Sequence, residues 1–133
     1  MGDCTVKRID EMEAVFGGGF KRARAELGVT SFGMQVLDFP PNADRYPEHD
    51  HAEEGQEEVF VPLSGRGELT VDGERHVLEP GMMVRIGPAA RRAITTGEEP
   101  LRLLALGGYP GKAYEGKEVS ELGAPDPLAQ SRG

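Results

Sequence analysis

The sequence has few of the features that mark secreted, membrane-bound or nucleic-acid-binding proteins. It holds a single cysteine, Cys4, so no internal disulfide can form and a cytoplasmic location is expected. No stretch approaches the roughly 20 apolar residues that cross a bilayer. The chain has 15 basic against 23 acidic residues, a formal net charge of -8. A field of that sign repels phosphate backbones and anionic lipid. We therefore expect neither a nucleic-acid nor a membrane partner.

Turn-forming residues, by contrast, are abundant. The 133 residues include 19 glycines and 10 prolines, mostly between short apolar runs, which favours an all-β sandwich or barrel over a helical bundle. The length suits a single domain. We expect an irregular lead-in over residues 1–19, a β-barrel over 20–108 and a tail over 109–133. The tail should lie on the barrel at first, through Tyr109 and Tyr114, and be loosely ordered near its end.

Short strands at even intervals are expected along the middle of the chain. Residues 20–27 alternate apolar and charged side chains, which is typical of a half-buried strand. Asp72-Gly73 predicts a two-residue hairpin turn, and Pro62 indicates a break in the ladder of its strand. The other expected strands cover residues 31–39, 58–63, 68–71, 74–78, 82–86, 92–96 and 101–106.

The main candidate for chemistry is a pair of histidines, His49 and His51, on either side of Asp50. In extended backbone both imidazoles point to one face, about 6–7 Å apart at Cα. Such a pair can meet one metal ion, and Glu58 adds a carboxylate at the head of the next strand. This ligand set leaves positions open for a substrate or dioxygen. The alternative is two solvated histidines in an acidic loop, where residues 53–54 fit a solvated charge run.

Two longer stretches give this pair a context. The run HDHAEEGQEEVFVPLSGRGEL and the later VDGERHVLEPGMMVRIGP resemble the two conserved motifs of the cupin superfamily. The first motif is His-x-His, a following Glu, six residues and then Gly, and six residues separate Glu58 from Gly65 here. The second motif has two proline- and glycine-containing turns around a strand, matched at residues 80–81 and 87–89. The resemblance covers roughly residues 30–107.

The resemblance implies a small jelly-roll β-barrel, often a homodimer, that holds a divalent transition metal (Fe, Mn, Ni or Zn). Carried over residue by residue, its ligands are His49, His51 and Glu58. Two departures from the family pattern stand out. The spacing from His51 to Glu58 is longer than usual, and Arg92 stands where the second-motif histidine falls. Arginine stays protonated and is a poor metal ligand, so the usual fourth ligand is absent.

Three alternatives for the site follow from that absence. The metal binds through the three remaining ligands, or His76 supplies a substitute, or the metal is lost. In the last case Arg92 pairs with Glu58 or holds an anionic ligand, because its forked donors suit a carboxylate. Strand alternation sends Arg92 to one face and Arg91 to the other. Phe60 is expected to line the core or the ligand pocket, and His76 is otherwise a structural hairpin histidine.

The resemblance leaves the class of function open, because one barrel hosts many activities. One hypothesis is a metal-dependent dioxygenase, isomerase or lyase in which the metal polarises a substrate oxygen and Arg92 orients an acidic group. A second is a metal-free ligand-binding or sensor barrel without catalysis, with Arg92 holding an anion. A third is a dimerisation unit without an occupied pocket. We expect a small-molecule partner, acidic if Arg92 binds it.

Overall fold

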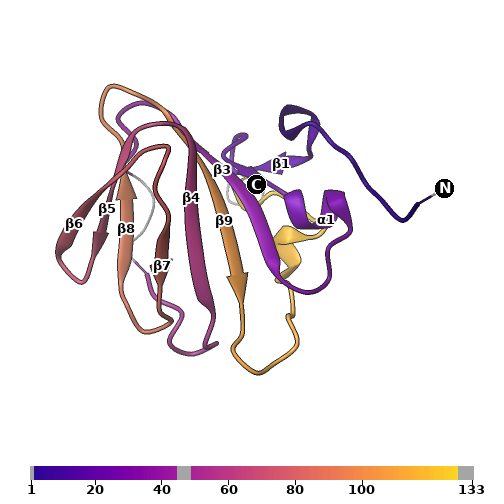
Figure 1. Ribbon diagram of the computed structural model, residues 1–133. Coiled ribbons are helices and arrows are strands. Elements are labelled where there is room, and N and C mark those ends of the chain that lie inside the picture. Colours follow the sequence, from indigo (N-terminus) through magenta and orange to yellow (C-terminus); the bar gives the residue numbers. More distant parts are fainter. Residues whose placement is uncertain (1, 45–48, 129–133) are drawn as a thin grey trace.

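Two antiparallel sheets make up the computed structural model, which describes residues 2–44 and 49–128 (Figure 1). The larger sheet has the order β1-β2-β3-β9-β4-β7, and the smaller has the order β6-β5-β8. The larger sheet consists of β1 (Ala14–Val15), β2 (Phe20–Lys21), β3 (Gly33–Phe39), β4 (Glu57–Gly65), β7 (Val84–Ile86) and β9 (Leu101–Gly108). The smaller sheet consists of β5 (Gly67–Val71), β6 (Glu74–Leu78) and β8 (Arg92–Thr95).

The expected all-β class is confirmed, with one difference in the barrel. In the part of the chain that the structure describes, the two sheets form separate ladders, so hydrogen bonds do not close the barrel into a ring. The sheets nevertheless enclose a common apolar core to which both contribute. Its buried members are Phe60, Leu69, Leu78, Ile86, Ile94, Leu101, Leu103 and Ala105.

Local turn chemistry fixes the strand ends as the sequence predicted. Asp72 and Gly73 have φ values of 47° and 85°, the left-handed pair that a tight hairpin turn requires. The pairing of β4 with β9 shifts register between Pro62 and Ser64, because proline has no N–H to give to the ladder. At Gly65, φ is 80° and an added Cβ would lie 1.8 Å from the carbonyl oxygen of Pro100. Only glycine allows this close approach.

The strand expected over residues 20–27 is wrong beyond its first two residues. β2 ends at Lys21, and a short helix, α1, covers Ala23–Leu27. Alanine, arginine, glutamate and leucine are all good helix formers, and a five-residue alternation of this kind does not separate strand from helix. Gly28 ends the helix with a φ of 77°, the usual left-handed helix stop. Within the described residues, no helix is long and apolar enough to cross a bilayer.

Both terminal segments contain short regular elements. β1 pairs with β2, so the sheet begins inside the lead-in of residues 1–19, which also holds a 3-10 turn at Ile9–Glu11. In the tail, Tyr109 and Tyr114 stack with ring centroids 5.7 Å apart, and a second 3-10 turn covers Glu118–Ser120. The tail passes beside α1 (Figure 1). Residues 129–133, where we expected loose order, lie outside the described residues.

Candidate functional site

Backbone hydrogen bonds bring the histidine pair to the end of the smaller sheet. The N–H of His49 donates to the carbonyl oxygen of Arg92 at 3.0 Å, and the N–H of Arg92 donates back at 2.8 Å. The N–H of His51 donates to the carbonyl oxygen of Pro88 at 2.7 Å. The segment that holds both histidines is therefore fixed along β8 and along the turn that precedes it.

The three expected ligands converge. One ligand atom from each of His49, His51 and Glu58 lies within 4.8 Å of the others. The two imidazole rings have centroids 5.1 Å apart and an interplanar angle of 85°. The longer spacing between His51 and Glu58 is absorbed by a turn at residues 52–55. The insertion thus leaves Glu58 in place beside the histidines.

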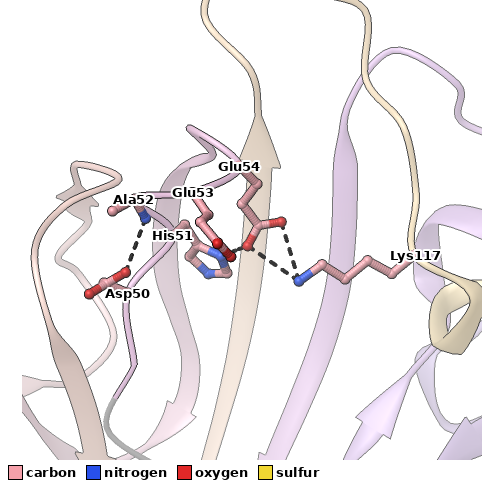
Figure 2. Close-up of a pocket in the computed structure, with 6 residues that line it drawn as sticks. All are labelled: Asp50, His51, Ala52, Glu53, Glu54 and Lys117. Carbon is pink, nitrogen blue, oxygen red and sulfur yellow. Dashed lines mark hydrogen bonds and ion pairs between the residues drawn. The ribbon is translucent and has the colours of Figure 1, made fainter.

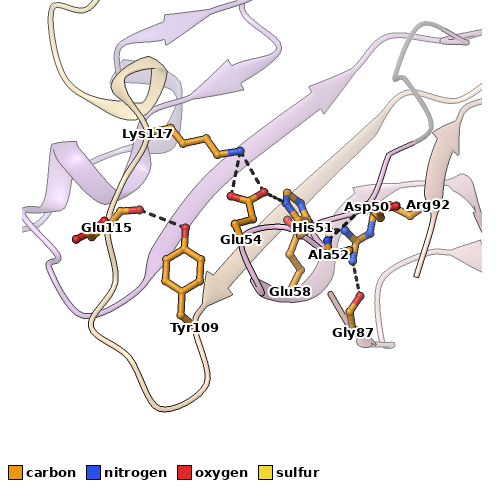
Figure 3. Close-up of polar contacts among 10 residues, drawn as sticks. All are labelled: Asp50, His51, Ala52, Glu54, Glu58, Gly87, Arg92, Tyr109, Glu115 and Lys117. Atoms are coloured by element: carbon orange, nitrogen blue, oxygen red, sulfur yellow. Dashed lines mark hydrogen bonds and ion pairs between the residues drawn. The ribbon is translucent and has the colours of Figure 1, made fainter. Parts of the chain in front are cut away.

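His51 lies between two carboxylates (Figure 3). Its Nδ1 is hydrogen-bonded to Oε1 of Glu54, and its Nε2 lies 3.2 Å from Oε1 of Glu58. The Glu58 carboxylate raises the pKa of His51; burial opposes this shift and Glu54 adds to it. Glu54 is in turn paired with Lys117, whose Nζ lies 3.2 Å from Oε2.

Arg92 points into the molecule and Arg91 points out of it, on opposite faces as strand alternation predicted. The Arg92 side chain is 0% exposed and its Nη1 lies 3.5 Å from Oε1 of Glu58. Its Nη2 donates to the carbonyl oxygen of Gly87 at 2.9 Å. The neighbouring Arg91 points outward, with 55% of its side chain exposed. The site therefore combines two imidazoles, one carboxylate and one buried positive charge.

Comparison with known proteins places this arrangement in a family. A family model described as a cupin domain matches residues 35–107, more than half of the chain. This chain belongs to the cupin family. The match includes the histidine pair, Glu58 and Arg92, so the ligand group lies inside the cupin region.

Three proteins similar to this cupin are an isomerase, a cupin protein and a lyase by name. A glucose-6-phosphate isomerase of Pyrococcus horikoshii is 38% identical over 71 residues, 49% of this chain and 36% of that relative. The matched segment thus spans little more than a third of that relative. A cupin protein of Bacteroides fragilis superposes with a TM-score of 0.67 at 23% identity, over 88% of this chain and 93% of that one. A DMSP lyase of Ruegeria pomeroyi superposes with a TM-score of 0.54 at 25% identity, over 66% and 46%.

The donor atoms of this cupin fit a divalent metal ion. Nε2 of His51 and Oε1 of Glu58 are buried and have no hydrogen-bond partner. A buried polar atom without a partner is costly and rare, and imidazole nitrogen with carboxylate oxygen is a usual donor set for divalent transition metals. Nε and Nη1 of Arg92 are buried without a hydrogen-bond partner as well. The arginine charge weakens the attraction of the site for a cation and strengthens it for an anion.

The remaining predicted residues lie away from the ligand group. Phe60 is fully buried in the apolar core, the position that we expected as one of its two alternatives. His76 lies on β6 with 42% of its side chain exposed, and its Nε2 is 4.0 Å from Oε2 of Glu74. The structure therefore does not bring His76 to the site. Among the residues that the structure describes, no other side chain joins the group in place of the missing fourth ligand.

Two residues at the site were missed by the sequence analysis, Glu54 and Lys117. Together with residues 50–53 they line a pocket of about 390 Å³ that borders the site on the side of His51 (Figure 2). Glu54 was interpreted as part of a solvated charge run, although its position three residues after His51 is a local signal for contact. Lys117 comes from the C-terminal tail, 63 residues away from Glu54, and no local pattern predicts that pairing.

Proposed function

We propose that this cupin binds a divalent transition metal ion (Fe, Mn, Ni or Zn) through His49, His51 and Glu58 and acts there as an isomerase on a small molecule. The observation that carries the proposal is the convergence of three ligand atoms within 4.8 Å. The unpartnered buried atoms of His51 and Glu58 support it. The relative with 38% identity makes sugar phosphates the first substrate class to test.

The residues of the site have separable roles in this proposal. When bound, a divalent ion polarises a carbonyl or hydroxyl oxygen of the substrate. A set of three protein ligands leaves coordination positions for that oxygen. Arg92 provides a fixed positive charge beside Glu58, because its Nη2 is tied to Gly87. A charge placed in advance stabilises negative charge that develops on the substrate oxygen.

Metal content tests the first half of the proposal. Protein purified without a histidine tag should hold about one equivalent of a transition metal by elemental analysis. The variants His51→Ala and Glu58→Gln should hold less than about a tenth of an equivalent, since each loses a ligand. His76→Ala is the matched control, because His76 lies outside the group and should keep the wild-type content. Wild-type protein with less than about a tenth of an equivalent would contradict the metal site.

Turnover tests the second half. Metal-loaded protein should interconvert aldose and ketose phosphates, as measured by NMR of the reaction mixture. Glu58→Gln should lose this activity. A panel of hexose and pentose phosphates separates the substrate class from one particular sugar. Metal binding without turnover on any of them would leave the metal site standing and exclude sugar-phosphate isomerisation.

A metal-free anion-binding barrel is the second candidate, and one observation favours it. Arg92 is fully buried, yet its Nε and Nη1 have no hydrogen-bond partner, so an anionic guest would satisfy both. Thermal-shift measurements in the presence of a chelator, with small carboxylates and phosphate, test this function. Stabilisation without metal that disappears in Arg92→Met would support it.

The homodimer stays a prediction, to be checked by light scattering.

A further inference from the structure

We propose that Glu54 and Lys117 are positioning residues that fix the tautomer of His51. Through Lys117, the C-terminal tail thereby sets which nitrogen of the His51 ring faces Glu58. The consequence for metal binding rests on the proposed function. The tautomer itself does not, because it is a property of the metal-free protein.

The first step is the choice between the two ring nitrogens of His51. A neutral imidazole donates from one nitrogen and accepts at the other, and the hydrogen bond made by one nitrogen decides the role of the other. Nδ1 is hydrogen-bonded to Glu54. Nε2 lies 3.2 Å from Oε1 of Glu58 and makes no hydrogen bond. The proton therefore belongs on Nδ1, and the lone pair of Nε2 faces Glu58, where a metal ligand must point.

The second step is the hold on Glu54. Nζ of Lys117 lies 3.3 Å from Oε1 and 3.2 Å from Oε2 of Glu54 (Figure 2). The same Oε1 accepts from His51. An ammonium group that contacts both oxygens limits the rotation of the carboxylate away from the ring. Outer carboxylates of this kind orient histidine ligands and raise their basicity.

The third step is the placement of the backbone that carries Lys117. The Lys117 side chain itself is 62% exposed, but neighbours on both sides of it in the sequence are held by contacts to the rest of the fold. On one side of it, the Arg24 guanidinium lies 5.9 Å from the centroid of the Tyr114 ring. On the other side, Nη2 of Arg24 is 2.6 Å from Oε1 of Glu121, and Nε of Arg22 donates to the carbonyl oxygen of Val119 at 2.8 Å. Both arginines are buried. The backbone around Lys117 is thus ordered before any ligand binds, which lowers the entropy cost of the contact.

The tautomer can be read directly by long-range proton–nitrogen NMR of metal-free protein, at a pH above the titration of His51. Wild-type His51 should carry its proton on Nδ1. Glu54→Ala should move the proton to Nε2 in a large share of molecules, because Glu58 is then the remaining acceptor. Lys117→Met should shift the tautomer in the same direction by less. Two variants are matched controls and should leave the tautomer unchanged. Glu57→Gln changes a carboxylate that is paired with Arg85 on the outer face, and Lys112→Met changes an exposed lysine of the tail.

Zinc affinity provides the second readout. Glu54→Ala should weaken zinc binding by about 10- to 100-fold, and Glu54→Gln should recover part of the loss, because the amide oxygen still accepts from Nδ1. An unchanged His51 tautomer in Glu54→Ala would overturn the inference. If the tautomer moves but wild-type protein binds none of iron, manganese, nickel and zinc, the inference stands and the proposed metal function fails. Should Glu54→Ala not fold, Lys117→Met carries the test, and an unchanged tautomer in that variant would overturn the inference.

Discussion

The interior of this cupin has an apolar end and a polar end, and the same strands supply both. On β4, Phe60 belongs to the apolar core, while Glu58, two residues earlier, belongs to the ligand group. On β8, Ile94 is in the core and Arg92 lies beside Glu58. Side chains two residues apart share a face of a strand. On each of these two strands, the inward-facing side chains therefore belong to the site at one position and to the apolar core two residues later.

The two ends differ in how well their atoms are satisfied. The core side chains are closely surrounded, with Phe60 and Ile94 both 0% exposed. At the polar end, atoms of His51, Glu58 and Arg92 are buried without a hydrogen-bond partner. Each such atom costs about 1–3 kcal/mol of stability. The polar end therefore stabilises the fold less than the apolar end does, a pattern that is typical of functional sites.

The largest effect is expected at the apolar end, from Phe60→Ala. Truncation of a fully buried phenylalanine leaves a cavity and should lower the free energy of unfolding by about 3–5 kcal/mol, measured by urea denaturation. Ile94→Val, in the same core, should cost about 0.5–1.5 kcal/mol. The control Met83→Ala removes a side chain that is 73% exposed and should stay within about 0.5 kcal/mol of wild type. If Phe60→Ala lost no more stability than the control Met83→Ala, the assignment of this end as the core would be contradicted.

The second largest loss of stability is expected at the polar end, from Arg92→Met. Arg92→Met leaves Glu58 buried without its positive neighbour and should destabilise the metal-free protein by about 3 kcal/mol. The double variant Arg92→Met with Glu58→Leu makes this end apolar as well, and should recover the loss or exceed wild-type stability. The same double variant should bind no metal. If the double variant were as unstable as Arg92→Met alone, the polar residues would stabilise the fold, contrary to the difference between the two ends described above.

Much of this division could be predicted from the sequence. The spacing of His49 and His51 and the cupin motif that includes Glu58 depend on neighbours in the sequence, and the three ligand atoms do lie within 4.8 Å of one another. Residues 22–27 failed because a short run of small and charged residues satisfies a strand pattern and a helix pattern equally, and tertiary contacts decided for α1. Lys117 could not be predicted, since its pairing depends on where two buried arginines hold the tail.

The missing fourth ligand can be restored at position 92, and the zinc affinity should then increase. Arg92→His removes the buried charge and places an imidazole at the position where the cupin pattern has its second-motif histidine. Zinc affinity, measured by competition with a chromophoric chelator, should rise by about tenfold or more, which is about 1.4 kcal/mol. Arg91→His is the control, because Arg91 points outward with 55% of its side chain exposed. Equal affinities in wild type and Arg92→His would show that Arg92 does not limit metal binding.

The smallest effect is expected on the outer face, where charges are paired but closer to water. Asp38 accepts from Nε of Arg102 at 2.8 Å and from Nζ of Lys21 at 2.7 Å. Burial raises the pKa of Asp38, but these two cations lower it by more, so the net pKa lies below the usual 3.8. A depressed folded-state pKa contributes stability that is present above the unfolded-state value and is lost as the pH falls through the folded-state value. As the pH falls below about 4, wild type should therefore lose up to about 1 kcal/mol more stability than Asp38→Asn, measured by urea unfolding across the pH range. Parallel curves for the two proteins would mean that this ion-pair cluster adds nothing, and would widen the contrast with the costly charges inside.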